Sequence, residues 1–244
     1  MTRSTGGIMW GVLPVPEQDN GPPFPADGTP AAMERLMARQ ERALRTRNAL
    51  IESAAEQFDR DGFETASLAT ISARAGVSNG ALHFHFASKT ALAGAVREAA
   101  AQRLGRITAS ERRSADTLQT LIDASHALVK GLRGDVVLRA GFGLGSNPAS
   151  RDSGEDLHER WHHWVEESFA QAGREGALAP KVSARDATLV VSATVAGFEA
   201  LGGQDPGWLS PTTLTRFWEL LLPRLAHESV LEGLVASGTG SEDG

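Results

Sequence analysis

Cysteine is absent from this chain of 244 residues, which excludes a disulfide framework and any metal site with thiolate ligands. No run of about 18 apolar residues occurs, so the sequence offers no candidate transmembrane helix. The first 30 residues also lack the basic and then apolar order of a secretory signal. We therefore expect a cytoplasmic protein without membrane contact.

The sequence also lacks most patterns of catalytic sites. It has no glycine-rich phosphate loop, no Ser, His and Asp arrangement for nucleophilic catalysis, and no opposed carboxylates. The motif His158-Glu159-x-x-His162 has the spacing that binds zinc on a helix, with the glutamate as general base. Arg160 places a cation beside it and no third ligand is evident, so a zinc metallohydrolase is a remote alternative. We expect no cofactor, no metal and no enzymatic activity.

The net charge of −6 is unevenly distributed along the chain. Between Met33 and Lys89 there are 8 Lys and Arg against 7 Asp and Glu, whereas the remainder has 16 against 23. Arg45 and Arg47 add positive charge at the start of the first helix predicted below. The excess of acidic residues therefore lies outside this segment, which stays compatible with binding to phosphates.

Three short amphipathic segments in the first third of the chain predict helices joined by two sharp turns. An apolar stripe over 50–58 predicts the first helix, and Gly62 is typical of its end. Ser67 is a typical N-cap of a second helix that Gly76 ends. Ser78 begins a third helix in which small residues come first and aromatic residues last. This order suits the reading helix of a helix-turn-helix.

The segment 76–96, GVSNGALHFHFASKTALAGAV, resembles the recognition helix and fourth helix of the TetR family of repressors. Within that family, the run 82–89, with Phe58-Asp59 and Gly62-Phe63, is most similar to the γ-butyrolactone receptors and receptor-like regulators of actinomycetes. The resemblance covers about 60 residues, and the rest matches by architecture only. It implies an all-α fold with an N-terminal three-helix helix-turn-helix domain and a C-terminal helical domain for ligand binding and dimerisation.

The start of the third helix carries the predicted base contacts. Ser78 and the amides that follow it are expected to hold a phosphate, because a helix N-terminus carries partial positive charge. Lys89 is expected to do the same at the fourth helix. Asn79 has the donor and acceptor groups for a base edge, and Gly80-Ala81 permits close approach to the groove.

The end of the third helix is rich in aromatic rings. His83 stands where the family usually has Tyr, which implies a phosphate contact. For His85 a phosphate contact and packing within the domain are both open. Phe84 and Phe86 are expected in the core, since duplex DNA offers them no free base face. The predicted DNA-binding residues are Arg45, Arg47, Ser67, Thr70, Ser78, Asn79, Gly80, Ala81, His83, His85 and Lys89.

The chain is expected to have a disordered arm at 1–36, a helix-turn-helix domain at 37–89, a helical regulatory and dimerisation domain at 90–236, and a disordered tail at 237–244. The arm and the tail are rich in residues that cannot keep a helix. Beyond the helix-turn-helix, helices are predicted at 90–106, 117–132, 135–144, 155–172, 184–201 and 211–226. The start of translation is open among Met1, Met33 and Met37.

Two of these helices predict a homodimer. Small residues dominate 184–201, and 211–226 is apolar over more than one face. Apposed to their copies, the two helices would form a four-helix interface, and a dimer suits a palindromic operator with two half-sites. The alternative is a buried helical pair in a monomer.

Aromatic and aliphatic residues of the C-terminal part predict an apolar ligand cavity. Trp161 and Trp164 lie three residues apart and share a helical face. The resemblance to lactone receptors implies a tryptophan in the cavity wall, whereas the alternative is that these aromatics fill the core. The predicted ligand-binding residues are Phe142, Leu144, Trp161, Trp164, Gln171, Thr194, Val195 and Phe198, with Ser192 as a further polar candidate.

Together these features predict a transcriptional regulator. The leading hypothesis is a repressor that a small ligand, of γ-butyrolactone type, releases from a palindromic operator to control secondary metabolism. A sensor of another drug or metabolite, or a ligand-independent repressor, are alternatives within the same class. The expected partners are double-stranded DNA, a second copy of the chain and a small molecule.

Overall fold

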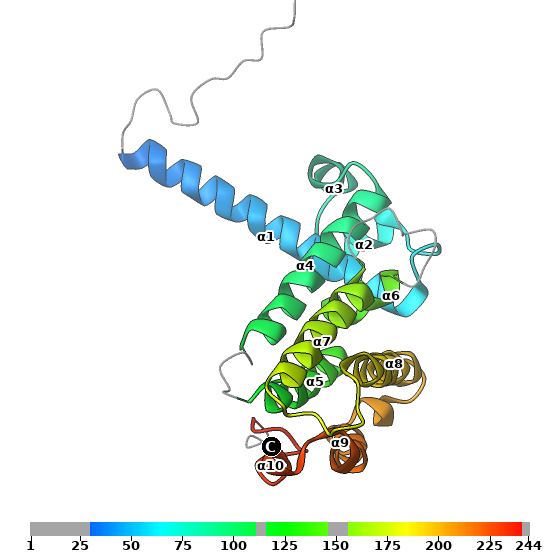
Figure 1. Cartoon of the computed structure of the whole chain (residues 1–244). Helices are drawn as coiled ribbons and strands as arrows, with labels where there is room; N and C mark the ends of the chain where they lie inside the picture. Colours follow the sequence, from blue (N-terminus) through cyan, green and yellow to red (C-terminus); the bar gives the residue numbers. More distant parts are fainter. Residues whose placement is uncertain (1–29, 111–115, 146–155, 241–244) are drawn as a thin grey trace, which may run out of the picture. The chain divides into compact units, whose positions relative to one another are not determined.

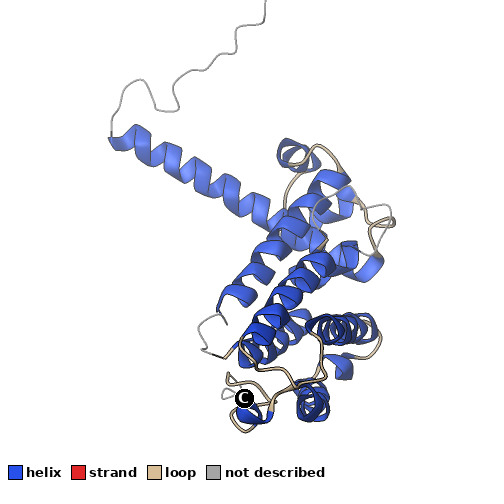
Figure 2. Ribbon diagram, in the orientation of Figure 1, coloured by secondary structure: helices blue, strands red, loops and turns tan. Residues whose placement is uncertain are grey.

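The computed structural model describes residues 30–110, 116–145 and 156–240, and every regular element in these ranges is helical (Figure 2). One isolated β-bridge, between Leu178 and Ala226, is the only extended pairing in the described ranges. The predicted all-α fold is confirmed. In chain order the elements are α1 (Pro30–Asp61), α2 (Leu68–Arg74), α3 (Asn79–His85), α4 (Lys89–Ser110), α5 (Thr117–Gly134), α6 (Val136–Gly145), α7 (Leu157–Arg174), α8 (Ala184–Gly202), η3 (Pro206–Leu209), α9 (Pro211–Leu225) and α10 (Glu228–Leu231).

The chain divides into two compact units, residues 1–44 and 45–244. The first unit contains the N-terminal part of α1, which begins at Pro30, although the sequence predicted a disordered arm as far as residue 36. Proline is favoured at the first helical position, and the Ala, Met, Glu, Arg and Leu that follow it are strong helix formers. The remainder of the predicted arm, residues 1–29, lies outside the described residues.

The second unit contains the rest of α1 and all other helices. Within it, α4 runs from the helix-turn-helix into the C-terminal helices and packs most extensively against α6 (Figure 1). This packing depends on Gly141, because a Cβ there would overlap the Cβ of Ala100 on α4 and lie 3.0 Å from Leu157 Cδ1. Glycine at this position therefore sets how closely α4 and α6 approach.

The C-terminal helices enclose a continuous apolar core. α7 packs against α8 and α5, and α9 against α5. The indole of Trp218 on α9 is 1% exposed, and its Nε1 donates a hydrogen bond to Ser125 Oγ on α5 at 2.9 Å. Buried indole N–H groups usually need such a partner. This bond fixes the position of α9 over α5.

A C-terminal clip, residues 235–239, is bound to polar side chains of α5. The Gln119 side-chain amide donates to Val235 O at 3.3 Å, and its Oε1 accepts from Val235 N at 2.8 Å. The Asp123 carboxylate accepts from Thr239 N at 2.8 Å and from Thr239 Oγ1 at 2.7 Å. The prediction of disorder from residue 237 is therefore wrong for 237–240, because these bonds satisfy buried polar groups of α5. Residues 241–244 lie outside the described residues.

Candidate nucleic-acid interface and ligand cavity

The turn from α2 to α3 depends on one glycine and one serine. Gly76 has a φ of 69°, a conformation that residues with a Cβ rarely adopt. Ser78 caps α3, since its Oγ accepts a hydrogen bond from the backbone N–H of Ala81 at 3.1 Å. Both features were predicted from the sequence. They fix the direction in which α3 leaves α2.

Two residues attach α3 to the domain, and the others form its outer surface. Leu82 and Phe86 are buried in the core, as predicted for Phe86. The remaining side of the helix and its cap is exposed or half-buried and consists of Ser78, Asn79, Gly80, Ala81, His83, Phe84 and His85. A short helix held on one side and free on the other is what insertion into a DNA groove requires.

Phe84 is the residue of α3 for which the sequence prediction was wrong. It was expected in the core, but it is 82% exposed. With 3.6 residues per turn, Leu82 and Phe86 face the same way, and a residue midway between them faces the opposite side. Helical geometry thus overrides the apolar character of the phenyl ring.

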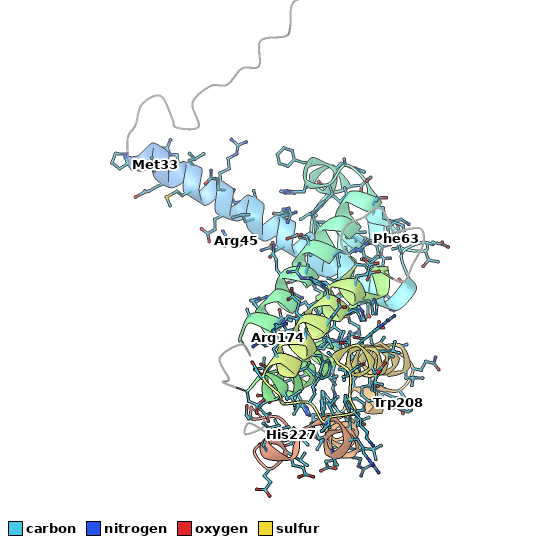
Figure 3. All side chains as sticks on the ribbon, viewed as in Figure 1. Met33, Arg45, Phe63, Arg174, Trp208 and His227 are labelled. Atoms are coloured by element: carbon cyan, nitrogen blue, oxygen red, sulfur yellow. The ribbon has the colours of Figure 1, made fainter. Side chains whose placement is uncertain are left out.

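Lys89 has a different environment from the one predicted. Its Nζ donates hydrogen bonds to the carbonyl oxygens of Glu64 at 2.9 Å and Ala66 at 3.1 Å, and it lies 4.8 Å from the ring centre of Phe63 (labelled in Figure 3). An ammonium has three N–H donors, of which two are used here. Lys89 therefore ties the start of α4 to the loop between α1 and α2, and a phosphate contact through its third N–H stays a prediction.

The remaining predicted DNA contacts lie on α1 and α2. Arg45, Arg47, Ser67 and Thr70 are all exposed. The guanidinium of Arg47 stands 5.2 Å from the ring centre of Phe86, which places its stem against the base of α3. Ser67 occupies the N-cap position of α2 without a side-chain capping bond. All four side chains thus lie at the surface, as contacts to phosphates would require.

An apolar cavity of about 280 Å³ lies between α7 and α8. Its size is close to the lower end of small-molecule sites, and a mostly apolar wall with a few polar groups is their usual composition. The lining residues are Leu132, Phe142, His158, Trp161, His162, Leu189, Ser192, Ala193, Val195, Ala196 and Glu199.

Part of the predicted ligand set lines this cavity. Phe142, Trp161 and Val195 do so, together with Ser192. Trp164 is instead stacked behind Trp161, with ring centres 5.0 Å apart and planes at 28°.

The other predicted ligand residues lie elsewhere. Leu144 lines the second cavity described below. Gln171 is exposed and bonded to Glu175, and Thr194 Oγ1 donates to Val190 O of its own helix at 2.8 Å. Phe198 packs edge-on against Phe217 of α9, with ring centres 6.2 Å apart. The sequence prediction grouped these residues with the cavity because of their composition. Which of them line the cavity depends on tertiary packing, which the sequence does not show.

Sequence reasoning missed three polar residues of the cavity wall. His158 lies three residues before Trp161 and four before His162, so it shares a helical face with each, and this spacing could have identified both histidines. Glu199 could not be found in this way, because it comes from α8. His162 Nδ1 lies 3.0 Å from Ser192 Oγ and joins α7 to α8 at the cavity.

The indole of Trp161 carries a polar group that the protein leaves without a partner. Trp161 is 3% exposed, and its Nε1 has no hydrogen-bond acceptor among the described residues. A buried N–H without a partner costs about 1–3 kcal/mol. A ligand with an oxygen acceptor next to this N–H would remove that cost.

His158 forms a charged edge of the cavity. Its ring stands nearly perpendicular to that of Phe142, with centres 4.9 Å apart, and its Nε2 lies 3.4 Å from Glu199 Oε2. The hydrogen bond to Glu199 raises the pKa of His158 above its ordinary value, against the opposing effect of burial, and the charges of Glu199 and Asp156 raise it further. The hydrogen bond and the two nearby carboxylates thus outweigh the effect of burial on the pKa of His158.

A second cavity, of about 220 Å³, lies where the end of α1 meets α6 and α8. Beside it, Arg139 on α6 donates from Nε to Asp59 Oδ1 at 3.0 Å and from Nη2 to Asp59 Oδ2 at 2.9 Å. Its Nη1 donates to the carbonyl oxygens of Leu132 and Arg133 at the end of α5. Glu199 lines both cavities. One arginine therefore connects the helix-turn-helix domain to two helices of the regulatory domain.

Comparison with known proteins identifies the helix-turn-helix. Residues 50–96, from the middle of α1 into α4, match the family described as bacterial regulatory proteins, tetR family. The chain therefore has a TetR-type DNA-binding domain and is a TetR-type transcriptional regulator. Helix α3 lies within the matched residues. TetR family regulators are not enzymes, which agrees with the expectation from the sequence.

Relatives of this TetR family chain include receptors for small signals. It is 28% identical to the A-factor receptor protein of Streptomyces griseus over 206 residues, which cover 83% of this chain and 71% of the relative. A solved γ-butyrolactone receptor, an ArpA-like protein, is 26% identical with a TM-score of 0.68 over 77% of this chain and 92% of the other. CprB from Streptomyces coelicolor, solved in complex with its operator sequence, is 26% identical with a TM-score of 0.67 over 79% and 94%.

The zinc motif does not form a metal site in this TetR family fold. His158 is engaged with Glu199 and His162 with Ser192, while Glu159 is exposed on the opposite side of α7 from the core. Within the described ranges no group of three or more His, Cys, Asp or Glu residues is placed to hold a metal ion. None of the described helices is both long and apolar enough to cross a membrane.

Proposed function

We propose that this TetR family regulator is a homodimeric, cytoplasmic repressor that binds a palindromic operator and is released from it by a small apolar ligand of the γ-butyrolactone type. The observation that carries the proposal is an apolar cavity lined by Trp161, whose indole N–H has no partner among the described residues, in a chain with an exposed third helix. Resemblance to the A-factor receptor and to solved γ-butyrolactone receptors supports this choice of ligand class.

The dimer is supported by large apolar side chains exposed on the last helices. Leu189 is 65% exposed, Leu220 81% and Trp208 (labelled in Figure 3) 41%. Val190 and Leu201 of α8 are also exposed. Exposed apolar residues gathered on neighbouring elements are typical of protein–protein interfaces. A second copy apposed on α8 and α9 would cover them and would supply the second reading helix for a palindrome.

The ligand is matched to the cavity by its polar atoms. A lactone ring presents carbonyl and ring oxygens, which accept but do not donate hydrogen bonds, and Trp161 Nε1 offers a donor. An alkyl chain on the ring would fill the space between Phe142, Val195 and Leu189. Such a ligand satisfies the indole and removes apolar surface from water in one binding event.

Release from DNA is a change in the populations of two states. A ligand that binds better to the state in which α4 and α6 have shifted would favour that state, and the two reading helices would no longer fit successive major grooves. Ligand and operator must then weaken the binding of each other by the same factor. Equal ligand affinities with and without saturating operator would contradict this mechanism.

The test begins with footprinting of the purified protein on the DNA upstream of its own gene, at stated salt. We expect a protected palindrome that is lost in Asn79→Ala and His83→Ala but kept in His163→Ala, which changes an exposed histidine of α7. A γ-butyrolactone should then release the wild type from this site and fail to release Trp161→Phe, which keeps an aromatic side chain but removes the pyrrole ring with its N–H. Release by another compound class would favour the drug or metabolite sensor, and release by none would favour a ligand-independent repressor.

A further inference from the structure

Phe84 is the most exposed large apolar residue of the described helix-turn-helix. It is 82% exposed, and its ring contacts that of His85, edge to face at 5.3 Å between centres. Exposing a phenyl ring to water is unfavourable, and a single exposed ring needs no explanation on an ordinary surface. On a helix that binds in a DNA groove, however, the position of the phenyl ring decides which group of the DNA it contacts.

The ring occupies the centre of the outer face of α3. Leu82 and Phe86 point into the domain, and Phe84 follows Leu82 by about 200° around the helix axis. Gly80, one turn before Phe84 on the same side, has no side chain, and no described residue lies within 3.4 Å of the position its Cβ would take. When α3 lies in a major groove, the phenyl ring is therefore the bulkiest group directed at the base edges.

Base edges in the major groove offer one apolar group, the C5 methyl of thymine. All other groups there are hydrogen-bond donors or acceptors, which a phenyl ring cannot satisfy and would separate from water. Insertion between stacked bases is a property of proteins that bend DNA from the minor groove. Thymine is consequently the base edge that best matches this side chain.

We propose that Phe84 is a specificity-determining residue that recognises a thymine methyl group in each operator half-site, opposite the C-terminal half of α3. This inference rests on the operator binding proposed above. It assigns sequence reading to an apolar contact, in addition to the polar contact expected from Asn79. Since the contact involves no charge, it contributes to sequence preference without changing the dependence of binding on salt.

The test removes the methyl group alone. In the footprinted operator, each thymine is replaced in turn by deoxyuridine at symmetric positions, and dissociation constants are measured at fixed salt for the wild type and Phe84→Ala. At one pair of positions the wild type should lose about fourfold per half-site, the value for one buried methyl-sized group, or about 15-fold for the dimer. Phe84→Ala should bind the thymine operator about as weakly as the wild type binds the uracil operator, with no thymine preference left.

Three controls distinguish recognition of the methyl group by Phe84 from a structural role of this residue. Phe84→Leu keeps an apolar side chain and should retain part of the thymine preference. His83→Ala should weaken both operators equally, because a phosphate contact does not distinguish thymine from uracil. Thermal unfolding of Phe84→Ala should match the wild type, since the ring buries little surface.

Three results would overturn the inference. If the wild type binds the operator and is indifferent to uracil at every position, or if Phe84→Ala keeps the wild-type preference, Phe84 reads no methyl group while the proposed function stands. If no palindrome is protected at all, both the inference and the proposed function fail, and the footprint tells these cases apart.

Discussion

The ion pair between Asp59 and Arg139 is expected to stabilise the joint between the DNA-binding and regulatory helices. The side chains are 26% and 29% exposed, so the pair is only partly screened by water. Arg139→Met removes the bonds to Asp59 and those to two carbonyl oxygens at the end of α5. Hydrogen bonds to charged groups contribute about 1.5–3 kcal/mol, and exposure reduces this figure. We expect Arg139→Met to lower the free energy of unfolding by about 2 kcal/mol.

Asp59→Asn removes the charge but keeps an acceptor, so we expect a smaller loss of about 1 kcal/mol. A double-mutant cycle with Arg139→Met, measured by urea unfolding at one protomer concentration, should give a coupling of about 1 kcal/mol. Asp61→Asn, in the exposed pair with Arg60, is the matched control and should leave unfolding unchanged within error.

The same variants test whether this ion pair transmits the ligand signal. Because Arg139 connects α1 to α6, its loss should reduce the factor by which ligand weakens operator binding, with intrinsic ligand affinity less affected. Additive effects of the two substitutions on unfolding, within about 0.3 kcal/mol, would refute the energetic reasoning. An unchanged ligand effect on operator affinity would refute the role in transmission.

Three further substitutions test other contacts. The interaction of Glu199 with protonated His158 should stabilise the wild type in full below about pH 6.5, and this stabilisation should be lost as the pH rises through the elevated folded pKa of His158. Glu199→Gln removes it, so the difference in unfolding free energy between the two proteins should shrink in alkaline buffer. A difference independent of pH would contradict this. Gly141→Val should cost about 1–3 kcal/mol by forcing α4 and α6 apart, whereas Gly143→Val, which has no neighbour within 4 Å, should cost clearly less in the same thermal scans. Lys89→Met should destabilise the protein by about 1–3 kcal/mol in urea unfolding through the loss of two backbone contacts, and a variant as stable as the wild type would show that these bonds are not needed.

Local sequence signals were sufficient for most of the helical framework. Caps and glycines act over a few residues, so Gly76 and Ser78 could be assigned correctly from the sequence. The predicted ranges for α5 to α9 differ from the observed ends by no more than two residues, because each helix carries a clear 3.6-residue repeat. The ligand and operator themselves are not encoded in such local signals.

Positions that depend on tertiary contacts were predicted less well. The two carbonyl oxygens that Lys89 binds could not be predicted, because the charge of a side chain is visible in a sequence and its partners in the fold are not. Gln171 was placed at the cavity on composition, yet it lies on the exposed side of α7. Phe84 was the avoidable error, since the spacing of Leu82 and Phe86 already excludes it from the core.

The C-terminal clip has a consequence for the order in which the chain can mature during synthesis. Asp123 of α5 is 8% exposed, and two of its bonds come from Thr239, which follows it by 116 residues. Until that residue has left the ribosome, a nearly buried carboxylate lacks most of its partners, and burying it in that state is costly. Helix α5 is thus completed by residues that are translated more than 100 residues after it. A chain that a premature stop shortens before residue 235 retains an α5 whose Gln119 and Asp123 lack these partners.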